Sequence, residues 1–332
     1  MTRHTHFAAL VAAMVTGLSL APANAQSDID FFNGKTIEYI VATDVGGGYD
    51  TYGRLVSEFM QKYLPGSTIV VRNLPGAGHV IGTNAIYNAE PNGLTMGTFN
   101  TGLIYQQLVG ANGVKFDLAE MSWIGKAATD PRVLVVSNSS GIESLEQLLA
   151  AKEEIRFGTG GIGSSDYVDM MMLTRALELP VKIIDGYNGN DNQLAMMRGE
   201  IHGIIASRSS AEKFVNEGHG RLLVQIGGTQ TDVPQLGDLI TSEIGRQVIG
   251  LIASNGTIGR LTAAPPGIEP ARLEALREAY RQATSDPDLL KRAETMGIPI
   301  DPLIGDELTP LIQAQFELSP ETLALVKELL AK

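Results

Sequence analysis

Residues 41–55, VATDVGGGYDTYGRL, join an apolar run to a polar, amphipathic run through three glycines. This order is typical of a β-strand that turns into an α-helix. Glycine lets the backbone approach a ligand closely and adopt positive φ, and the free N–H groups of a helix's first turn are donors for an anion. The stretch therefore predicts a strand, a turn and a helix that together can hold an acid group.

Three more glycine-bearing turns follow expected strands and precede expected helices, so that the full set is residues 46–50, 75–78, 158–165 and 186–189. In parallel α/β sheets such turns lie at the carboxyl ends of the strands, where ligands bind. We therefore expect the four turns to converge on one ligand site that uses backbone donors.

Apolar, β-branched runs alternate with amphipathic stretches along the chain, which indicates an α/β fold with mainly parallel sheets. The expected strands are residues 36–42, 67–72, 94–98, 122–127, 132–136, 155–157, 181–184, 201–206, 222–226 and 258–263. The clearest expected helices are residues 51–63, 80–88, 144–151, 165–178, 191–198, 235–252 and 270–284. The tail, residues 286–332, predicts three short helices broken at 297–302 and near Pro320.

Two apolar stretches of similar character, SWIGKAATDPRVLVV and GTIGRLTAAPPGI, stand about 130 residues apart. We interpret them as the two crossings of a two-domain protein with a cleft. The first domain would then comprise residues 26–126 and 260–332, and the second, residues 127–259, would be inserted in it. The alternative is that both stretches are ordinary strands of one large sheet.

The N-terminus, MTRHTHFAALVAAMVTGLSLAPANAQ, has Arg3 before a short apolar run and an AxA pattern that ends at Ala25. This pattern predicts a secretory signal peptide, residues 1–25, cleaved after Ala25, and hence a periplasmic protein. An N-terminal anchor helix is the alternative. No later segment has the roughly 18 to 20 continuous apolar residues of a membrane span, so we expect no membrane insertion of the mature chain.

The charge and the cysteine and histidine content of the chain limit the kinds of partner and cofactor that it can bind. The 332-residue chain has a net charge of -12, and loss of Arg3 with the leader makes it -13. An acidic protein is a poor partner for nucleic acid or an anionic membrane surface. There is no cysteine, and the three histidines that remain after cleavage, His79, His202 and His219, are too scattered for a metal motif. We therefore expect neither a metal site nor a cofactor.

One motif favours another function. Gly158, Gly160 and Gly163 spell GxGxxG between an expected strand and helix, and Asp185 stands 22 residues beyond, as in dinucleotide-binding folds. An exported nicotinamide-dependent oxidoreductase is thus an alternative, although it leaves the leader and the other three turns unexplained. Ser164 lies in GIGSS, which is not the GxSxG nucleophile motif. We expect no catalytic residues and no enzyme.

Each charged side chain near the turns has either a structural role or a role in binding the ligand. Asp50 and Arg54 are four residues apart at a helix start, where they form either an ordinary helical ion pair or a ligand-shaping pair. Arg208 follows an apolar strand in IIASRSSAE, where it is either a guanidinium for the ligand or a solvated helix-start residue.

The series GGGYDTYGRL, VRNLPGAGHVIG and PNGLTMGTFNTG resembles the extracytoplasmic solute receptors of tripartite tricarboxylate transporters, the Bug family of periplasmic binding proteins. The likeness covers nearly the whole mature chain. The pair GGGxD and NxPGAG is quite specific, whereas FGTGGIGSSD and GYNGND match the family's second-domain loops more loosely. The GxGxxG motif is one of these loops.

The resemblance implies a type II periplasmic-binding-protein fold, in which two α/β domains close on a small organic carboxylate that is passed to the large and small membrane subunits of a transporter. A carboxylate sensor for a signalling kinase would use the same fold. In the family, one carboxylate is held largely by backbone donors and waters of the first-domain loops. Carried over by motif, these are Gly46, Gly47, Gly48, Tyr49 and Asp50, then Pro75, Gly76, Ala77 and Gly78, with Thr98 and Thr101 in a third loop. The far end of the ligand would meet Gly163, Ser164, Ser165, Asp166, Tyr187, Asn188 and Gly189.

The chain departs from the family pattern at Val45, where proline is common, and at Asp166 and Tyr167, where many members have a histidine. The usual Tyr-Lys-Gly is Tyr187-Asn188-Gly189. Loss of a lysine and gain of an acid argue against a second ligand carboxylate. Either Arg208 compensates, or the distal group of the ligand is neutral or aromatic.

Overall fold

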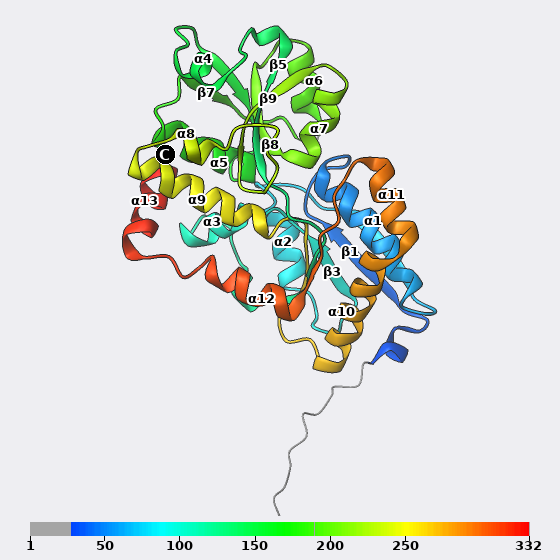
Figure 1. The fold of residues 1–332 in the computed structure, drawn as a ribbon. Helices are drawn as coiled ribbons and strands as arrows, with labels where there is room; N and C mark the ends of the chain where they lie inside the picture. The colour runs from blue at the N-terminus through cyan, green and yellow to red at the C-terminus, as the bar shows by residue number, and fades with distance from the viewer. Residues whose placement is uncertain (1–27, 189, 332) are drawn as a thin grey trace, which may run out of the picture.

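The computed structural model describes residues 28–188 and 190–331. The expected signal peptide and Gly189 lie outside the described residues. Two β-sheets, each covered by helices, form two lobes (Figure 1). We call the sheet that contains the first strand, with its helices, the first lobe, and the other sheet with its helices the second lobe. Among the described residues, no helix is long and apolar enough to cross a membrane.

The first sheet has six strands in the order β11-β4-β10-β3-β1-β2. Their bounds are β1 Thr36–Val41, β2 Thr68–Asn73, β3 Thr95–Thr98, β4 Ser122–Lys126, β10 Leu261–Ala264 and β11 Leu303–Ile304. The second sheet has five strands in the order β7-β6-β8-β5-β9. They are β5 Arg132–Ser137, β6 Ile155–Gly158, β7 Val181–Ile184, β8 Gly203–Ser207 and β9 Gly220–Ile226.

Helices cover both faces of each sheet. On the first sheet, α1 Gly48–Lys62, α10 Pro270–Ser285 and α11 Pro287–Met296 share one core, and α2 Val80–Tyr87, α3 Leu103–Leu108 and α12 Gly305–Ala314 share the other. On the second sheet, α4 Leu145–Leu149, α5 Ser165–Ala176, α8 Leu236–Leu239, α9 Glu243–Thr257 and α13 Pro320–Leu330 cover one face, and α6 Asp191–Met197 and α7 Arg208–Asn216 cover the other. Three short 3-10 helices complete the elements: η1 Ile29–Phe32, η2 Leu118–Glu120 and η3 Asn138–Ser140.

Local sequence explains where several helices begin. Helices α10, α11 and α13 each start with proline directly after a capping residue, which is Glu269, Asp286 and Ser319 respectively. Proline suits the first helical position because its missing N–H has no partner there, and the cap accepts from the next free amides. The expectation of three short helices in residues 286–332 is confirmed, since this tail contains α11, α12 and α13.

The expectation of mainly parallel sheets is wrong. Four strand pairs among the described residues are parallel, namely β1 with β2, β1 with β3, β6 with β7 and β6 with β8. The other pairs, which involve β4, β5, β9, β10 and β11, are antiparallel. Parallel neighbours need a helical crossover on the same sheet. Strands β5 and β10 each arrive from the other lobe instead, so nothing imposes the parallel direction on them.

One expected helix is divided, and three elements were not expected. The helix expected over residues 235–252 is divided, because Ser242 starts a new helix, α9, by accepting from the amide of Gly245 at 3.2 Å. Helices α3 and α7 and strand β11 were not predicted from the sequence. Strand β11 and helix α3 have only two and six residues, so their periodicity is weak.

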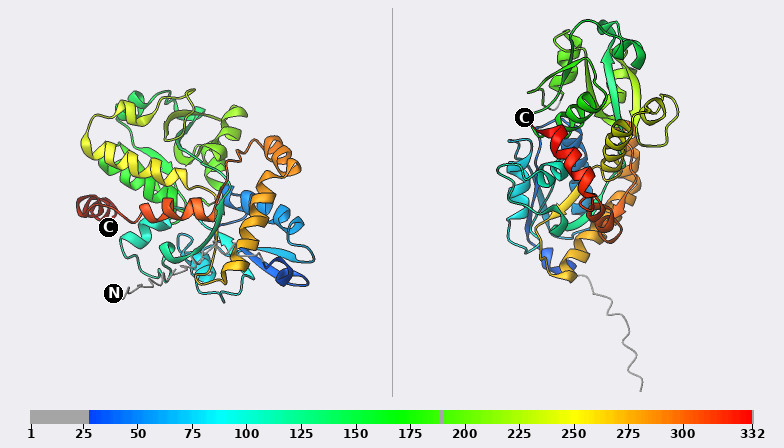
Figure 2. Two further views of the ribbon diagram at one scale, coloured as in Figure 1. Left: turned by 60° about the horizontal axis from the view of Figure 1, so that its bottom comes forward. Right: turned by 90° about the vertical axis from the view of Figure 1, so that its left-hand side faces the viewer.

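The chain passes between the lobes after β4, which ends at Lys126, and again before β10, which begins at Leu261. We retain residues 26–126 with 260–332, and 127–259, as a proposed domain division. Helix α13 crosses that division, because its buried Val326 and Leu329 belong to the core of the second lobe. Figure 2 shows this helix, in red, against the second lobe.

Candidate functional site

A cavity of about 130 Å³ lies between the two lobes. At about 30 Å³ per water molecule in the liquid, this is the volume of roughly four waters, or of a small organic molecule. It is lined by Thr43, Asp44, Gly47, Gly48, Tyr49, His79 and Asn100 from the first lobe, by Arg132, Gly160, Ser164, Ser165, Asp166, Tyr187, Asn188, Asn192, Ile205, Ala206, Ser207 and Ser210 from the second, and by Arg260 at the return crossing.

The first lobe presents the start of α1 to this cavity. Gly47 is the N-cap of the helix, and Gly47, Gly48 and Tyr49 line the cavity. The first amides of a helix have no partner within the helix, and the helix dipole makes this end positive. The turn predicted from the sequence is thus a place where an anion is stabilised.

The acid of this turn is directed elsewhere. Asp50 is buried and is not among the residues that line the cavity. Its Oδ2 accepts from the amide of Gly46 at 2.9 Å, and its Oδ1 accepts from Arg54 Nε and Asn73 Nδ2, each at 2.9 Å. The carboxylate therefore stabilises the glycine turn. Of the two roles considered for Asp50 and Arg54, the structure shows the helical ion pair.

The second lobe presents the start of α5 to the same cavity. Ser164 is the N-cap, and Ser164, Ser165 and Asp166 all line the cavity. The carboxylate of Asp166 accepts from the amide of Gly160 at 2.8 Å and from Ser164 Oγ at 2.5 Å. Two helix starts, one from each lobe, therefore meet at one cavity. Three of the four predicted turns line it, whereas the turn at residues 75–78 does not.

Glycines let the lobes touch at two places beside the cavity. A Cβ on Gly78 would lie 2.5 Å from the carbonyl oxygen of Ile162, and a Cβ on Gly102 would lie 2.6 Å from Cα of Ser165. Real Cβ atoms do not approach other atoms so closely, so both contacts require glycine in this arrangement. The lobes are therefore closed on the cavity, with backbone against backbone.

Arg260, which directly precedes β10, reaches the cavity from the return crossing. Its side chain is 3% exposed, and its Nη2 lies 2.5 Å from Asp130 Oδ2 and 3.2 Å from Ser209 Oγ. The guanidinium lies 4.8 Å from the ring centre of Tyr49 and 4.9 Å from that of Tyr52. One buried cation thus contacts both lobes.

Arg132, the first residue of β5, lines the cavity from the other crossing. Its Nε donates to Asp169 Oδ2 at 2.8 Å, and its Nη1 lies 3.3 Å from Ser207 Oγ. Burial raises the pKa of Asp169 to about 6, although Arg132 opposes the shift. Among the described residues, Arg132 Nη2, Asp169 Oδ1 and Arg260 Nε are buried without a hydrogen-bond partner.

Asn100 also faces the cavity with unused hydrogen-bonding capacity. Its Nδ2 and Oδ1 are both buried and have no partner among the residues that the structure describes. Burial of an amide without a partner is costly. Asn100 can therefore offer both a donor and an acceptor to a bound molecule.

The structure brings together only part of the predicted site. The predicted residues that line the cavity are Gly47, Gly48, Tyr49, Ser164, Ser165, Asp166, Tyr187 and Asn188. The predicted residues that do not line it are Gly46, Asp50, Pro75, Gly76, Ala77, Gly78, Thr98, Thr101, Gly163 and Arg208. Several of the latter support the site instead, since Gly46 and Asp50 fix the first turn and Gly78 meets the loop of Gly163. A ligand role for any of these residues stays a proposal.

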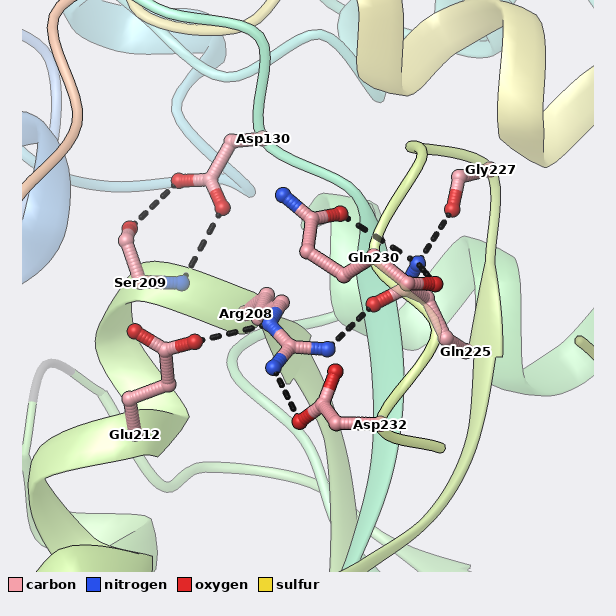
Figure 3. A network of polar contacts seen from close by, with 8 residues as sticks. All are labelled: Asp130, Arg208, Ser209, Glu212, Gln225, Gly227, Gln230 and Asp232. Carbon is pink, nitrogen blue, oxygen red and sulfur yellow. Dashed lines mark hydrogen bonds and ion pairs between the residues drawn. The ribbon is translucent and has the colours of Figure 1, made fainter. Parts of the chain in front are cut away.

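Arg208 is directed away from the cavity, contrary to the role considered for it. Figure 3 shows its guanidinium enclosed by Glu212, Gln225 and Asp232, at 2.7, 2.6 and 2.5 Å. Each nitrogen of the fork already has an acceptor, and the residue helps to line a separate groove at the back of the crossings. The position at a strand end was read correctly, but the direction of the side chain was not.

Residues missed by sequence reasoning include Arg132 and Arg260. Both lie inside the two stretches identified as crossings, and this position was the available signal, although Lys126 in the first stretch does not line the cavity. His79 was counted only as a potential metal ligand. Within the described part of the chain, no group of three or more metal-ligating side chains occurs.

The dinucleotide alternative fits poorly. The cavity at the motif, of about 130 Å³, is smaller than the roughly 300 Å³ or more of pockets that hold drug-sized ligands. A larger groove of about 970 Å³ is lined neither by a glycine of the motif nor by Asp185. Gly163 of the GxGxxG motif faces Gln106 of the other lobe, and Asp185 is not among the residues that line the cavity. Of the three motif glycines, Gly163 serves the contact between the lobes, whereas Gly158 and Gly160 pack against residues of their own lobe.

Comparisons with known proteins agree with this architecture. A family model described as "Tripartite tricarboxylate transporter family receptor" matches residues 53–322. The "UPF0065 protein in tcbD-tcbE intergenic region" of Pseudomonas sp. (strain P51) is 24% identical over 314 residues, which is 93% of this chain and 91% of the relative.

Solved structures show the same fold. The periplasmic binding protein BugD is 18% identical with a TM-score of 0.72, and the match covers 89% of this chain and 97% of BugD. MatC from Rhodopseudomonas palustris, solved with bound malate, is 19% identical with a TM-score of 0.71, over 88% of this chain and 99% of MatC.

Proposed function

Because this chain belongs to the tripartite tricarboxylate transporter family of receptors, we propose that it captures a small organic carboxylate between its lobes and presents it to membrane subunits of a tripartite transporter. The family consists of solute-binding receptors, and MatC, which shares the fold, was solved with malate. Export by a signal peptide cleaved after Ala25, and binding without catalysis, are parts of this proposal.

The observation that carries the proposal is the meeting of two helix starts, α1 and α5, at one cavity enclosed by both lobes. A ligand there touches both lobes only when they are closed. It therefore favours the closed form by the difference between its affinities for the closed and open forms. The closed surface, which contains parts of both lobes, is what the membrane subunits would recognise.

Binding is tested by a thermal-unfolding screen of purified protein with small carboxylates, pyridine nucleotides and neutral compounds of similar size. A ligand present at 100 times its dissociation constant adds about 2.7 kcal/mol to the free energy of unfolding. We expect some carboxylates to raise the unfolding temperature and to compact the protein in small-angle X-ray scattering. Stabilisation by pyridine nucleotides alone would refute the proposal.

A further inference from the structure

The two ends of the cavity differ in charge. Arg132 and Arg260 also line a second, smaller cavity of about 10 Å³ beside the crossings, which places them at the hinge end. Asp44, His79 and Asp166 line the main cavity but not the smaller one, and we call the part of the cavity that they line its other end. Asp130 and Asp169 also line the smaller cavity and pair with Arg260 and Arg132, so the hinge end holds two arginine–aspartate pairs. The other end holds two aspartates, and among the described residues no arginine or lysine besides Arg132 and Arg260 lines the main cavity.

At the hinge end, the positive groups reinforce each other. A Cβ on Gly48 would lie 2.7 Å from both Nη1 and Nη2 of Arg260, so the guanidinium rests against the first residue of α1. A cation beside the positive end of a helix is unfavourable unless an anion lies close to both. Asp130 compensates Nη2, whereas Nη1 has no hydrogen bond to any described residue. This end is suited to a carboxylate.

Arg260 holds this position at a cost in its own backbone. Its φ is 56°, a left-handed conformation that residues with a side chain rarely adopt. Such strain persists where the surrounding structure fixes the residue, and it is concentrated at functional sites. Here the rings of Tyr49 and Tyr52 and the carboxylate of Asp130 fix the guanidinium.

At the other end, Asp166 and His79 accept hydrogen bonds, whereas Ser165 and Asn188, which also line the cavity, can both donate and accept. Asp166 already receives two, from Gly160 and Ser164, and each carboxylate oxygen can accept one more. Nδ1 of His79 lies 3.0 Å from the carbonyl oxygen of Ala42, so it carries the proton and Nε2 is left as an acceptor. Burial lowers the pKa of His79, which keeps the ring neutral at pH 7.

The place of Asp166 in its helix does not by itself explain why it faces the cavity. Asp50 is equally close to the start of α1, yet it turns away to Gly46 and Arg54. Acids in the first turn of a helix commonly cap it. Asp166 both caps α5 and presents negative charge to the ligand space.

We propose that the ligand carries a carboxylate at one end and an ammonium group at the other, as in an amino acid, with the carboxylate at Arg260 and the start of α1 and the ammonium at Asp166. The inference deepens the proposed function and rests on it. A second carboxylate at the Asp166 end would lie beside the carboxylates of Asp44 and Asp166, with no cation among the described residues that line that end. An ammonium group supplies three donors and the opposite charge.

Calorimetric titration with matched probes tests this polarity: succinate, 4-aminobutyrate and butyrate, then the five-carbon set glutarate, 5-aminopentanoate and pentanoate. We expect the aminoacids to bind about tenfold or more tightly than the diacids, with the simple acids between them. A diacid that binds as tightly as its amino counterpart overturns the inference and leaves the proposed function standing. Failure of every carboxylate in the thermal screen overturns both.

Two variants locate the ends. Asp166→Asn is expected to weaken the aminoacids about tenfold and to strengthen the diacids, which reverses the preference. Asp288→Asn is the matched control, because Asp288 is also the second residue of its helix, α11, and its side chain is 82% exposed away from the cavity. An unchanged preference in Asp166→Asn contradicts the inference.

Arg260→Gln is expected to weaken all acids about 100-fold, and Arg260→Lys, which keeps the charge, about tenfold. Arg221→Gln is the control, since Arg221 pairs with Glu143 at the surface. If Arg260→Gln does not fold, the Lys variant still decides, because its unchanged affinity would contradict a carboxylate site at this residue.

Discussion

The starts of α1 and α5 have similar local sequence but opposite roles. Each follows a strand and a glycine turn, and each has an aspartate in its first turn, Asp50 and Asp166. At the start of α1, Asp50 turns away from the cavity to Arg54, and Arg260, which comes from the return crossing, lines the cavity instead. At the start of α5, Asp166 itself lines the cavity. The comparison teaches that a helix start sets where an anion site can form, while distant side chains decide its sign.

The largest expected effect comes from holding the two helix starts apart. In Gly78→Ala the new Cβ meets the backbone oxygen of Ile162, which cannot move aside as a side chain does. We expect carboxylate affinity to fall about 100-fold or more, measured by calorimetry. Gly141→Ala is the control, because Gly141 has a similar φ, 71° against 60°, and no heavy atom within 4 Å of the added Cβ. Equal losses in both variants would show that backbone strain, not closure, is responsible.

A milder separation tests the start of α5 alone. Gly102 has an ordinary φ of -61°, so alanine strains no backbone there, but its Cβ would meet Cα of Ser165 in the closed form. We expect affinity to fall about tenfold while the unfolding temperature without ligand is unchanged or raised. Gly250→Ala in α9, where the Cβ meets nothing within 4 Å, should stabilise by about 1 kcal/mol without changing affinity.

The two aspartates should separate stability from ligand preference. Asp50→Asn is expected to cost about 1–3 kcal/mol in the free energy of unfolding, because charge-assisted hydrogen bonds are lost, with little change in ligand preference. Asp166→Asn should show the reverse. Chemical denaturation and calorimetry on both proteins check this, and a shift of preference in Asp50→Asn would remove the distinction.

The same pair has a pH signature. Burial opposes ionisation of Asp50, but hydrogen bonds from the Gly46 amide and Arg54 outweigh it and lower its pKa. A lowered pKa adds stability at neutral pH that is lost as the pH falls below the ordinary value of about 4. We therefore expect Asp50→Asn to flatten the loss of stability as the pH falls below about 4.

The smallest expected effect concerns Asp169, one turn further into α5. Its pKa of about 6 means that the carboxylate is largely protonated at pH 5, which leaves Arg132 with less compensating charge. We expect acids to bind two- to threefold more tightly at about pH 5.5 than at 7.5, and this dependence to vanish in Asp169→Asn. The same pH dependence in the variant would assign it to the ligand or to another group.

The sequence by itself determined the local parts of this protein. Strand, glycine turn and helix start at residues 41–55 follow from neighbours a few positions apart, as do the proline-led helices of the tail. Backbone conformation depends on such near neighbours, so the helix start that lines the cavity was predictable.

Only the tertiary structure decided which side chains reach that site. Arg260 pairs with Asp130, which is 130 positions away in the sequence. Arg208 pairs with Asp232 instead and does not line the cavity. Whether neighbouring strands are parallel or antiparallel likewise depends on how the chain passes between the lobes, and not on the sequences of the strands themselves. These outcomes depend on packing between segments far apart in the chain, for which a single sequence carries no local signal.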